Sequence, residues 1–160
     1  MRTRSTYLSV GAAGVAVSAY MHFYLYFWGG YRAISIDRIA GLDISRSFAL
    51  NAIVGIIIAE LIVVSIRFRR FSVPAAVLGL GFAAGALGAY TLSRTSGLLG
   101  FTENQWTTEA VISKLAELIA VIALGTFLLS SVSERRTTSA PARESEPGFH
   151  RTDSVPATHE

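Results

Sequence analysis

Four apolar stretches, each about twenty residues long, fill most of this 160-residue chain and constrain its fold more than any other feature. They cover residues 7–28, 47–66, 71–92 and 108–131. The hydrocarbon core of a bilayer is about 30 Å thick, and an α-helix that rises about 1.5 Å per residue needs about twenty apolar residues to cross it. The sequence therefore predicts an all-α fold, an integral membrane four-helix bundle whose main partner is the lipid bilayer.

The composition agrees with a membrane protein and excludes several chemistries. Hydrophobic residues make up 51% of the chain and charged residues 16%, which is far from the mix of an average soluble domain. The net charge of +3 comes from arginines that flank the apolar stretches, whereas nucleic-acid binding requires a basic patch on a folded face, so we expect no nucleic-acid partner. The chain has no cysteine, which excludes disulfides, thiolate catalysis and cysteine-ligated metal centres.

The arginines also predict the topology. The two chain ends and the second connection, which would share one side of the membrane, carry more basic residues than the first and third connections. By the positive-inside rule, both termini are expected in the cytoplasm, with the protein in the plasma membrane. The counted residues are Arg2, Arg4, Arg67, Arg69, Arg70, Arg135 and Arg136 against Arg32, Arg38, Arg46 and Arg94. An alternative is that the first stretch is a signal peptide cleaved after Ala19, which would leave three helices.

Polar residues predict the domain limits and the starts of helices. We expect one transmembrane domain over residues 1–132, and a disordered cytoplasmic tail over residues 133–160, which nearly lack large apolar side chains. Asp43 and Thr107 precede the second and fourth stretches, where their side chains are suited to accept hydrogen bonds from free backbone N–H groups. The connection between the second and third stretches is so short that these two helices must be antiparallel neighbours.

The third stretch is rich in small residues, among them Gly81, Gly85 and Gly88. Small residues let helix backbones approach closely in lipid, where dispersion contacts supply much of the attraction between helices. We interpret these glycines as helix-packing contacts inside the bundle, and a homodimer contact is the alternative.

Ionisable side chains at membrane depth are costly and are candidates for function. His22 and Asn51 are predicted at similar depths near the outer end of the bundle, and the fourth stretch adds further polar groups there. The favoured interpretation is a structural ion pair between Lys114 and Glu117 near the membrane interface, and the alternative is that these groups converge on an outward-opening polar pocket. The candidate pocket residues from the helices are His22, Asn51, Glu109, Lys114 and Glu117.

Glu60 is predicted at inner-leaflet depth, about 10 Å along the second helix from the level of Arg67. At 100° per residue it faces away from Asn51, so it belongs to a separate charge site. A carboxyl group there must find a partner such as Arg67 or stay protonated. We expect either a neutral, hydrogen-bonded structural acid or a site that couples protons or cations. We expect no metal and no cofactor, since the sequence contains no ligand motif for either.

Four short runs carry a family resemblance: HFYLY at 22–26, GYRAI at 30–34, FALN at 48–51 and GLLGFTE at 97–103. With the four-helix plan, they resemble small uncharacterised four-pass membrane proteins of high-GC Gram-positive bacteria, which are similar in architecture to DoxX-like proteins. The resemblance spans about residues 20–129 and implies no established activity. It implies an outer cluster in which His22 and Asn51 are joined by further residues, namely Tyr26, Tyr31, Arg32, Phe101 and Glu103.

These observations favour three functions in order. The first is a non-catalytic accessory or interaction subunit of a membrane complex, because the chain has small-residue faces and a free tail. The second is a small transporter or ligand-binding bundle that uses the outer polar pocket. The third is a redox-associated protein that binds quinone or haem, for which the aromatic side chains at the outer end of the first helix could supply a pocket instead of an interfacial belt.

Overall fold

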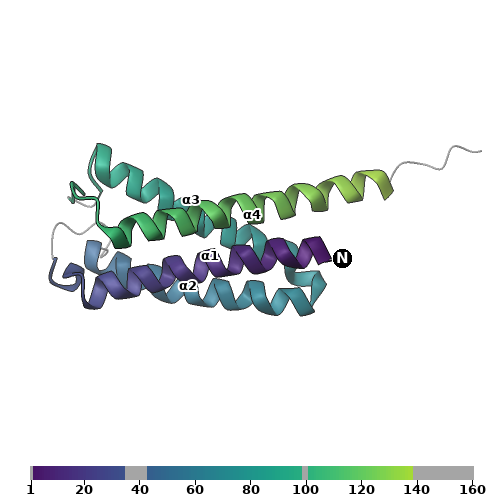
Figure 1. Ribbon diagram of the computed structural model, residues 1–160, viewed down its shortest axis with the longest axis horizontal. Helices are drawn as coiled ribbons and strands as arrows, with labels where there is room; N and C mark the ends of the chain where they lie inside the picture. Colours follow the sequence, from purple (N-terminus) through teal and green to yellow (C-terminus); the bar gives the residue numbers. More distant parts are fainter. Residues whose placement is uncertain (1, 35–42, 99–100, 139–160) are drawn as a thin grey trace, which may run out of the picture.

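The structure is a computed structural model that describes residues 2–34, 43–98 and 101–138. Four long helices lie side by side along the molecule (Figure 1). They are α1 (Arg2–Phe27), α2 (Ile44–Arg67), α3 (Ser72–Thr95) and α4 (Thr108–Thr138), with the short 3-10 helices η1 (Tyr31–Ala33) and η2 (Arg69–Phe71) between them.

Each long helix is long and apolar enough to span a membrane. The candidate spans are Thr3–Phe27, Ile44–Arg67, Arg69–Thr95 and Thr108–Glu134. Each coincides with one of the four predicted stretches, and all four show large apolar side chains on their outward surfaces, such as Ile57 at 51% and Ile122 at 60% relative exposure. Outward apolar side chains on every helix are what a bundle immersed in hydrocarbon requires.

The helices begin where short polar side chains cap them. Asp43 accepts a hydrogen bond from the backbone N–H of Arg46 at 2.8 Å, and Ala110 N–H donates to the Thr107 hydroxyl at 3.2 Å. Both predicted caps are therefore confirmed. Because only η2 separates α2 from α3, these two helices form the antiparallel hairpin expected from the short connection.

α4 extends further than its apolar stretch. It continues through Thr138, so residues 133–138 are helical and do not belong to a disordered tail. An ion pair helps to hold this extension: Arg4 Nη1 lies 2.6 Å from Glu134 Oε2, and Arg4 Nη2 donates to Ser131 Oγ at 2.7 Å. The remainder of the predicted tail, residues 139–160, lies outside the described residues.

α1 is the most central helix, because the two largest helix–helix interfaces of the bundle are those of α1 with α2 and with α4. The core along its length is built from medium and large apolar side chains, such as Val15, Ile62 and Phe127, with alanines between them. One end of the bundle holds the amino terminus and η2, and we call it the arginine-rich end because Arg4 and Arg69 lie there. We call the opposite end the loop end (Figure 1).

The glycines that join helices are not the ones the sequence pattern suggested. Gly81, Gly85 and Gly88 face open space, because a Cβ atom at any of them would meet no atom within 4 Å. The interpretation of these three as contacts inside the bundle is therefore wrong. The inward face of α3 is instead the one that carries Ala76, Gly79, Ala83 and Ala86.

Close approach of backbones occurs at Gly14 and Gly55. A Cβ atom on Gly14 would come within 2.6 Å of the backbone oxygen of Ala116, and one on Gly55 would come within 2.8 Å of the Cβ atom of Ala19. These contacts let α4 and α2 pack closely on α1. Whether Gly81, Gly85 and Gly88 form a homodimer contact stays a prediction.

Candidate functional site: a polar pocket at the loop end

A network of polar side chains inside the bundle centres on Glu117, which is fully buried. Its Oε1 accepts hydrogen bonds from Ser18 Oγ at 2.7 Å and from Ser113 Oγ at 3.0 Å. Lys114 Nζ donates to both carboxylate oxygens, at 2.8 and 2.6 Å. Because every partner of Glu117 is a donor, the group is held as a carboxylate and Lys114 balances its charge. This is a buried pair, unlike the wet interfacial pair of the structural interpretation.

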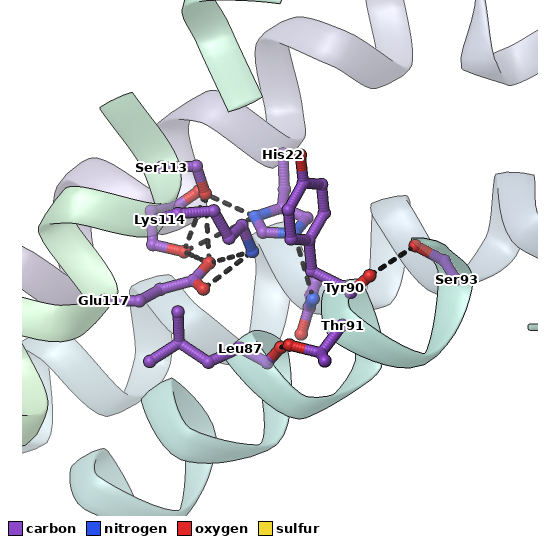
Figure 2. Close-up of polar contacts among 10 residues, drawn as sticks. His22, Leu87, Tyr90, Thr91, Ser93, Ser113, Lys114 and Glu117 are labelled. Atoms are coloured by element: carbon purple, nitrogen blue, oxygen red, sulfur yellow. Dashed lines mark hydrogen bonds and ion pairs between the residues drawn. The ribbon is translucent and has the colours of Figure 1, made fainter. Parts of the chain in front are cut away.

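His22 connects this network to α2. Its Nδ1 lies 2.8 Å from the backbone oxygen of Ser18, and because a carbonyl oxygen only accepts, Nδ1 carries the hydrogen. Its Nε2 is then the acceptor for Asn51 Nδ2 at 3.1 Å. Both ring nitrogens are thus used. Asn51 contacts His22, and Figure 2 shows His22 beside Lys114 and Glu117, so these four predicted residues come together.

A cavity of about 100 Å³ lies beside the network and toward the loop end. Figure 2 shows Lys114 reaching from α4 toward His22, with Tyr90 of α3 close by. The Lys114 ammonium lies 5.0 Å from the centre of the Tyr90 ring, within range of a cation–π attraction. The Tyr90 hydroxyl is buried and has no hydrogen-bond partner within residues 2–34, 43–98 and 101–138. The polar and aromatic lining residues are His22, Tyr31, Ser47, Phe48, Asn51, Tyr90, Ser93, Phe101, Glu103, Ser113 and Lys114.

Tyr31 and Glu103 lie together where the connections meet the cavity. Tyr31 Oη donates to Glu103 Oε2 at 2.6 Å, and the Tyr31 ring stacks on Phe48 at 4.2 Å between centroids. Burial raises the pKa of Tyr31, and the hydrogen bond to Glu103 raises this pKa further. The phenol is therefore held as a neutral donor, and the contact ties the connection after α1 to the one before α4.

Four of the predicted pocket residues do not line the cavity: Glu117, which is buried in the network beside it, and Arg32, Tyr26 and Glu109. Arg32 is exposed, and its backbone oxygen accepts from Ser45 at 3.3 Å. Tyr26 is half-buried and packs edge-on against Phe27. Glu109 is half-buried in the first turn of α4, one turn before the network.

The predicted charge site at Glu60 and Arg67 is not formed within the chain. Both side chains are exposed, and no hydrogen bond or ion pair joins either to another described residue. Glu60 lies instead along an open groove of about 660 Å³ between α1 and α2. The α1 side of this groove is lined by small residues: Ser9, Ala12, Ala13 and Ala16.

Sequence reasoning missed two functional groups of the pocket. Ser18 is absent from the predicted pocket, although a hydroxyl four residues before His22 on the same helix face is a usable signal. Tyr90 lies near the end of an apolar stretch, where an interfacial role is the default. Among residues 2–34, 43–98 and 101–138, no three side chains of the metal-ligating types gather.

Comparison with known proteins returned no match: no family description, no curated protein and no solved structure is similar to this chain. The resemblance to DoxX-like proteins therefore stays a prediction, and function must be argued from the pocket.

Proposed function

We propose that this protein is a ligand-binding membrane bundle that holds a small neutral carbonyl compound in the loop-end cavity. The observation that carries the proposal is the buried Tyr90 hydroxyl, which has no hydrogen-bond partner among the described residues and belongs to a residue of the cavity wall. A buried hydroxyl without a partner costs about 1–3 kcal/mol, which a ligand that accepts its hydrogen bond would recover.

Three side chains at the cavity wall retain hydrogen-bond donors. Lys114 uses its ammonium for Glu117 and still has one N–H, and Asn51 has one N–H beyond the one given to His22. With the Tyr90 hydroxyl, these donors favour a ligand that accepts hydrogen bonds. Because Glu117 already balances the charge of Lys114, they favour a neutral acceptor such as an amide or ketone over a carboxylate.

The size of the cavity limits the part of the ligand that enters. An engineered apolar cavity of about 150 Å³ accommodates benzene. The cavity of about 100 Å³ in this protein therefore has room for a head group of a few heavy atoms, with any longer part directed toward Tyr31 and Phe101.

Three water-soluble compounds of equal chain length test the proposal. We expect butyramide to give saturation-transfer NMR signals with the protein in lipid nanodiscs, butyrate to give weaker signals, and butylammonium to give none. Tyr90→Phe should weaken butyramide binding about tenfold, since it removes one buried hydrogen bond. The matched control is Tyr20→Phe, because Tyr20 is 57% exposed on α1. Equal signals from wild type and Tyr90→Phe with all three compounds would disprove the proposal.

The hydrogen bonds of His22 separate the two redox alternatives, haem binding and quinone binding. Ligation of haem iron requires a free ring nitrogen, whereas both nitrogens of His22 have hydrogen-bond partners. A quinone, in contrast, presents carbonyl oxygens and belongs to the proposed ligand class. Organic extraction of protein purified from its own membrane, followed by ultraviolet absorbance, distinguishes a quinone from a smaller carbonyl compound.

A second function, that of an accessory subunit, is favoured by Glu60. A carboxyl group in the apolar groove between α1 and α2 would face hydrocarbon unless another molecule covers it. The small residues Ala12, Ala13 and Ala16 would let a helix approach closely. The charge of Glu60 selects the occupant: a transmembrane helix of another protein that carries a lysine or arginine at the same depth.

Synthetic transmembrane peptides test this second function. One peptide carries a single lysine at its centre, and its matched control carries leucine there. We expect energy transfer in vesicles to show preferential binding of the lysine peptide, and Glu60→Gln should abolish the preference. Equal binding of both peptides to wild-type protein would rule out this role for Glu60.

A further inference from the structure

A second cavity, of about 220 Å³, lies at the arginine-rich end of the bundle and belongs to no site described above. Its walls come from α1, α2, η2 and the first residue of α3. Two arginines line it, Arg4 and Arg69, together with the apolar side chains of Leu8 and Ile66. No acidic residue is among the described residues that form its lining.

The two arginines retain hydrogen-bonding capacity. Arg4 donates to Glu134 and Ser131 through its two terminal nitrogens, which uses two of the five N–H groups of a guanidinium. Glu134 lies outside the cavity and its side chain is 60% exposed, so it neutralises Arg4 only weakly. Arg69 is exposed, and its guanidinium has no partner within the part of the chain that the structure describes.

Two guanidinium groups beside a cavity at the end of a membrane-spanning bundle are the donor set that binds phosphate oxygens. The apolar part of the lining indicates the source of the phosphate. Leu8 and Ile66 lie within the spans, one to two turns from the arginines in sequence, so the same cavity offers hydrocarbon contact below and positive charge above. A free phosphate ion would use only the charge, whereas a phospholipid would use both.

We propose that this cavity is a binding site for the phosphate of an anionic phospholipid, with Arg4 and Arg69 as the ligands of the phosphate and Leu8 and Ile66 against the first part of an acyl chain. Basic pockets between the ends of transmembrane helices are suited to such head groups. The site requires no assumption about which leaflet the arginine-rich end occupies, since phospholipid phosphates line both. It is also independent of the ligand proposed for the loop-end cavity.

Native mass spectrometry of the detergent-solubilised protein tests the site with phosphatidylglycerol as the probe. We expect phosphatidylglycerol to bind more tightly than phosphatidylcholine, and Arg69→Gln to weaken this binding about fivefold, the effect of one arginine on an anionic lipid. Arg69→Lys keeps the charge and should restore most of the binding. The matched control is Arg32→Gln, which removes one exposed positive charge at the opposite end.

Three outcomes would overturn the proposal. Equal affinity for the two lipids would show that charge does not select the ligand. Equal losses in Arg69→Gln and Arg32→Gln would show that net charge, and not the cavity, attracts the lipid. Full displacement of phosphatidylglycerol by millimolar inorganic phosphate would assign the site to free phosphate. Because Arg69 is exposed, its substitution is not expected to unfold the bundle.

Discussion

Glu117 is the residue on which the loop-end pocket depends most. A fully buried carboxylate is tolerated only when its charge is paired and its oxygens are hydrogen-bonded, and Lys114, Ser18 and Ser113 supply these partners. The pair therefore places a fixed ammonium group at the cavity wall. Because the two charges compensate each other, loss of either Lys114 or Glu117 should lower the free energy of unfolding.

Lys114→Met should destabilise the protein by about 3–5 kcal/mol, because it leaves the buried Glu117 charge without compensation. The double variant Lys114→Met with Glu117→Gln should regain most of this loss, since glutamine is neutral and still accepts from the two serines. Unfolding by SDS in mixed micelles measures both. Glu109→Gln on the same helix is the control, with an expected change within about 0.5 kcal/mol. Equal losses in the single and double variants would contradict a charge pair.

Tyr31 provides a pH dependence outside the membrane spans. Its folded-state pKa is raised, first by burial and then by Glu103, so the folded protein keeps the phenol proton at pH values where the unfolded chain has lost it. The stabilising contribution is therefore complete below about pH 10, the ordinary tyrosine pKa, and declines as pH rises above it. Absorbance titration at alkaline pH should show that one tyrosine of the wild-type protein loses its proton at unusually high pH, and this step should be absent in Tyr31→Phe. Identical titrations would contradict the assignment.

At the scale of elements, α3 has two faces of small residues with different tasks. The inward face, which includes Gly79 and Ala83, packs on the bundle, whereas a Cβ atom at Gly81, Gly85 or Gly88 would meet no atom of the described residues within 4 Å. The spacing of small residues predicts that a helix can pack closely against another helix. When one helix has two such faces, offset by two residues, the spacing alone does not show which face packs on the bundle. This is why the sequence-based choice of face was wrong.

Alanine substitutions distinguish the two kinds of glycine. Gly81→Ala, Gly85→Ala and Gly88→Ala should each leave stability unchanged or raise it by up to about 1 kcal/mol, because alanine favours the helix and the added methyl has space. Gly14→Ala should lower stability by about 1–3 kcal/mol, because its methyl would meet the backbone of Ala116. SDS unfolding of the monomer compares them. A destabilising effect of Gly85→Ala in the monomer would contradict the open space around this residue.

Other parts of the element level and of the site follow directly from the sequence. The spans, the caps at Asp43 and Thr107 and the convergence of His22 with Asn51 depend on hydropathy, local hydrogen bonding and depth, which are all local in sequence. The burial of the Tyr90 hydroxyl depends on how α3 packs against the other helices that line the cavity. The exposure of Glu60 depends on how α1 and α2 are rotated about their axes, which only packing determines.

At the scale of the whole molecule, the two ends of the bundle differ in chemistry. The loop end holds the enclosed polar pocket and the aromatic residues Trp28 and Trp106, whereas the opposite end holds the amino terminus, η2 and the Arg4–Glu134 pair. The four antiparallel helices bring the start of α1 and the described end of α4 to the arginine-rich end (Figure 1). If the arginine-rich end faces the cytoplasm, as the positive-inside rule predicts, the loop-end pocket faces the other side of the membrane.

Single-cysteine labelling tests this orientation without background, because the chain has no cysteine of its own. On intact cells, a membrane-impermeant maleimide should label Ser96→Cys and Thr102→Cys at the loop end. Thr3→Cys and Ser133→Cys should react only after the membrane is permeabilised; all four positions are exposed, so access to solvent is matched within the protein.

The labelling pattern also distinguishes the alternatives. Cleavage after Ala19 would remove the Thr3→Cys label from the mature protein and leave the Ser133→Cys label in place. Labelling of Thr3→Cys and Ser133→Cys on opposite sides would mean an odd number of spans. In that case the buried network could not form as described, because Ser18 of α1 and Glu117 of α4 meet only when both helices cross the same membrane beside each other.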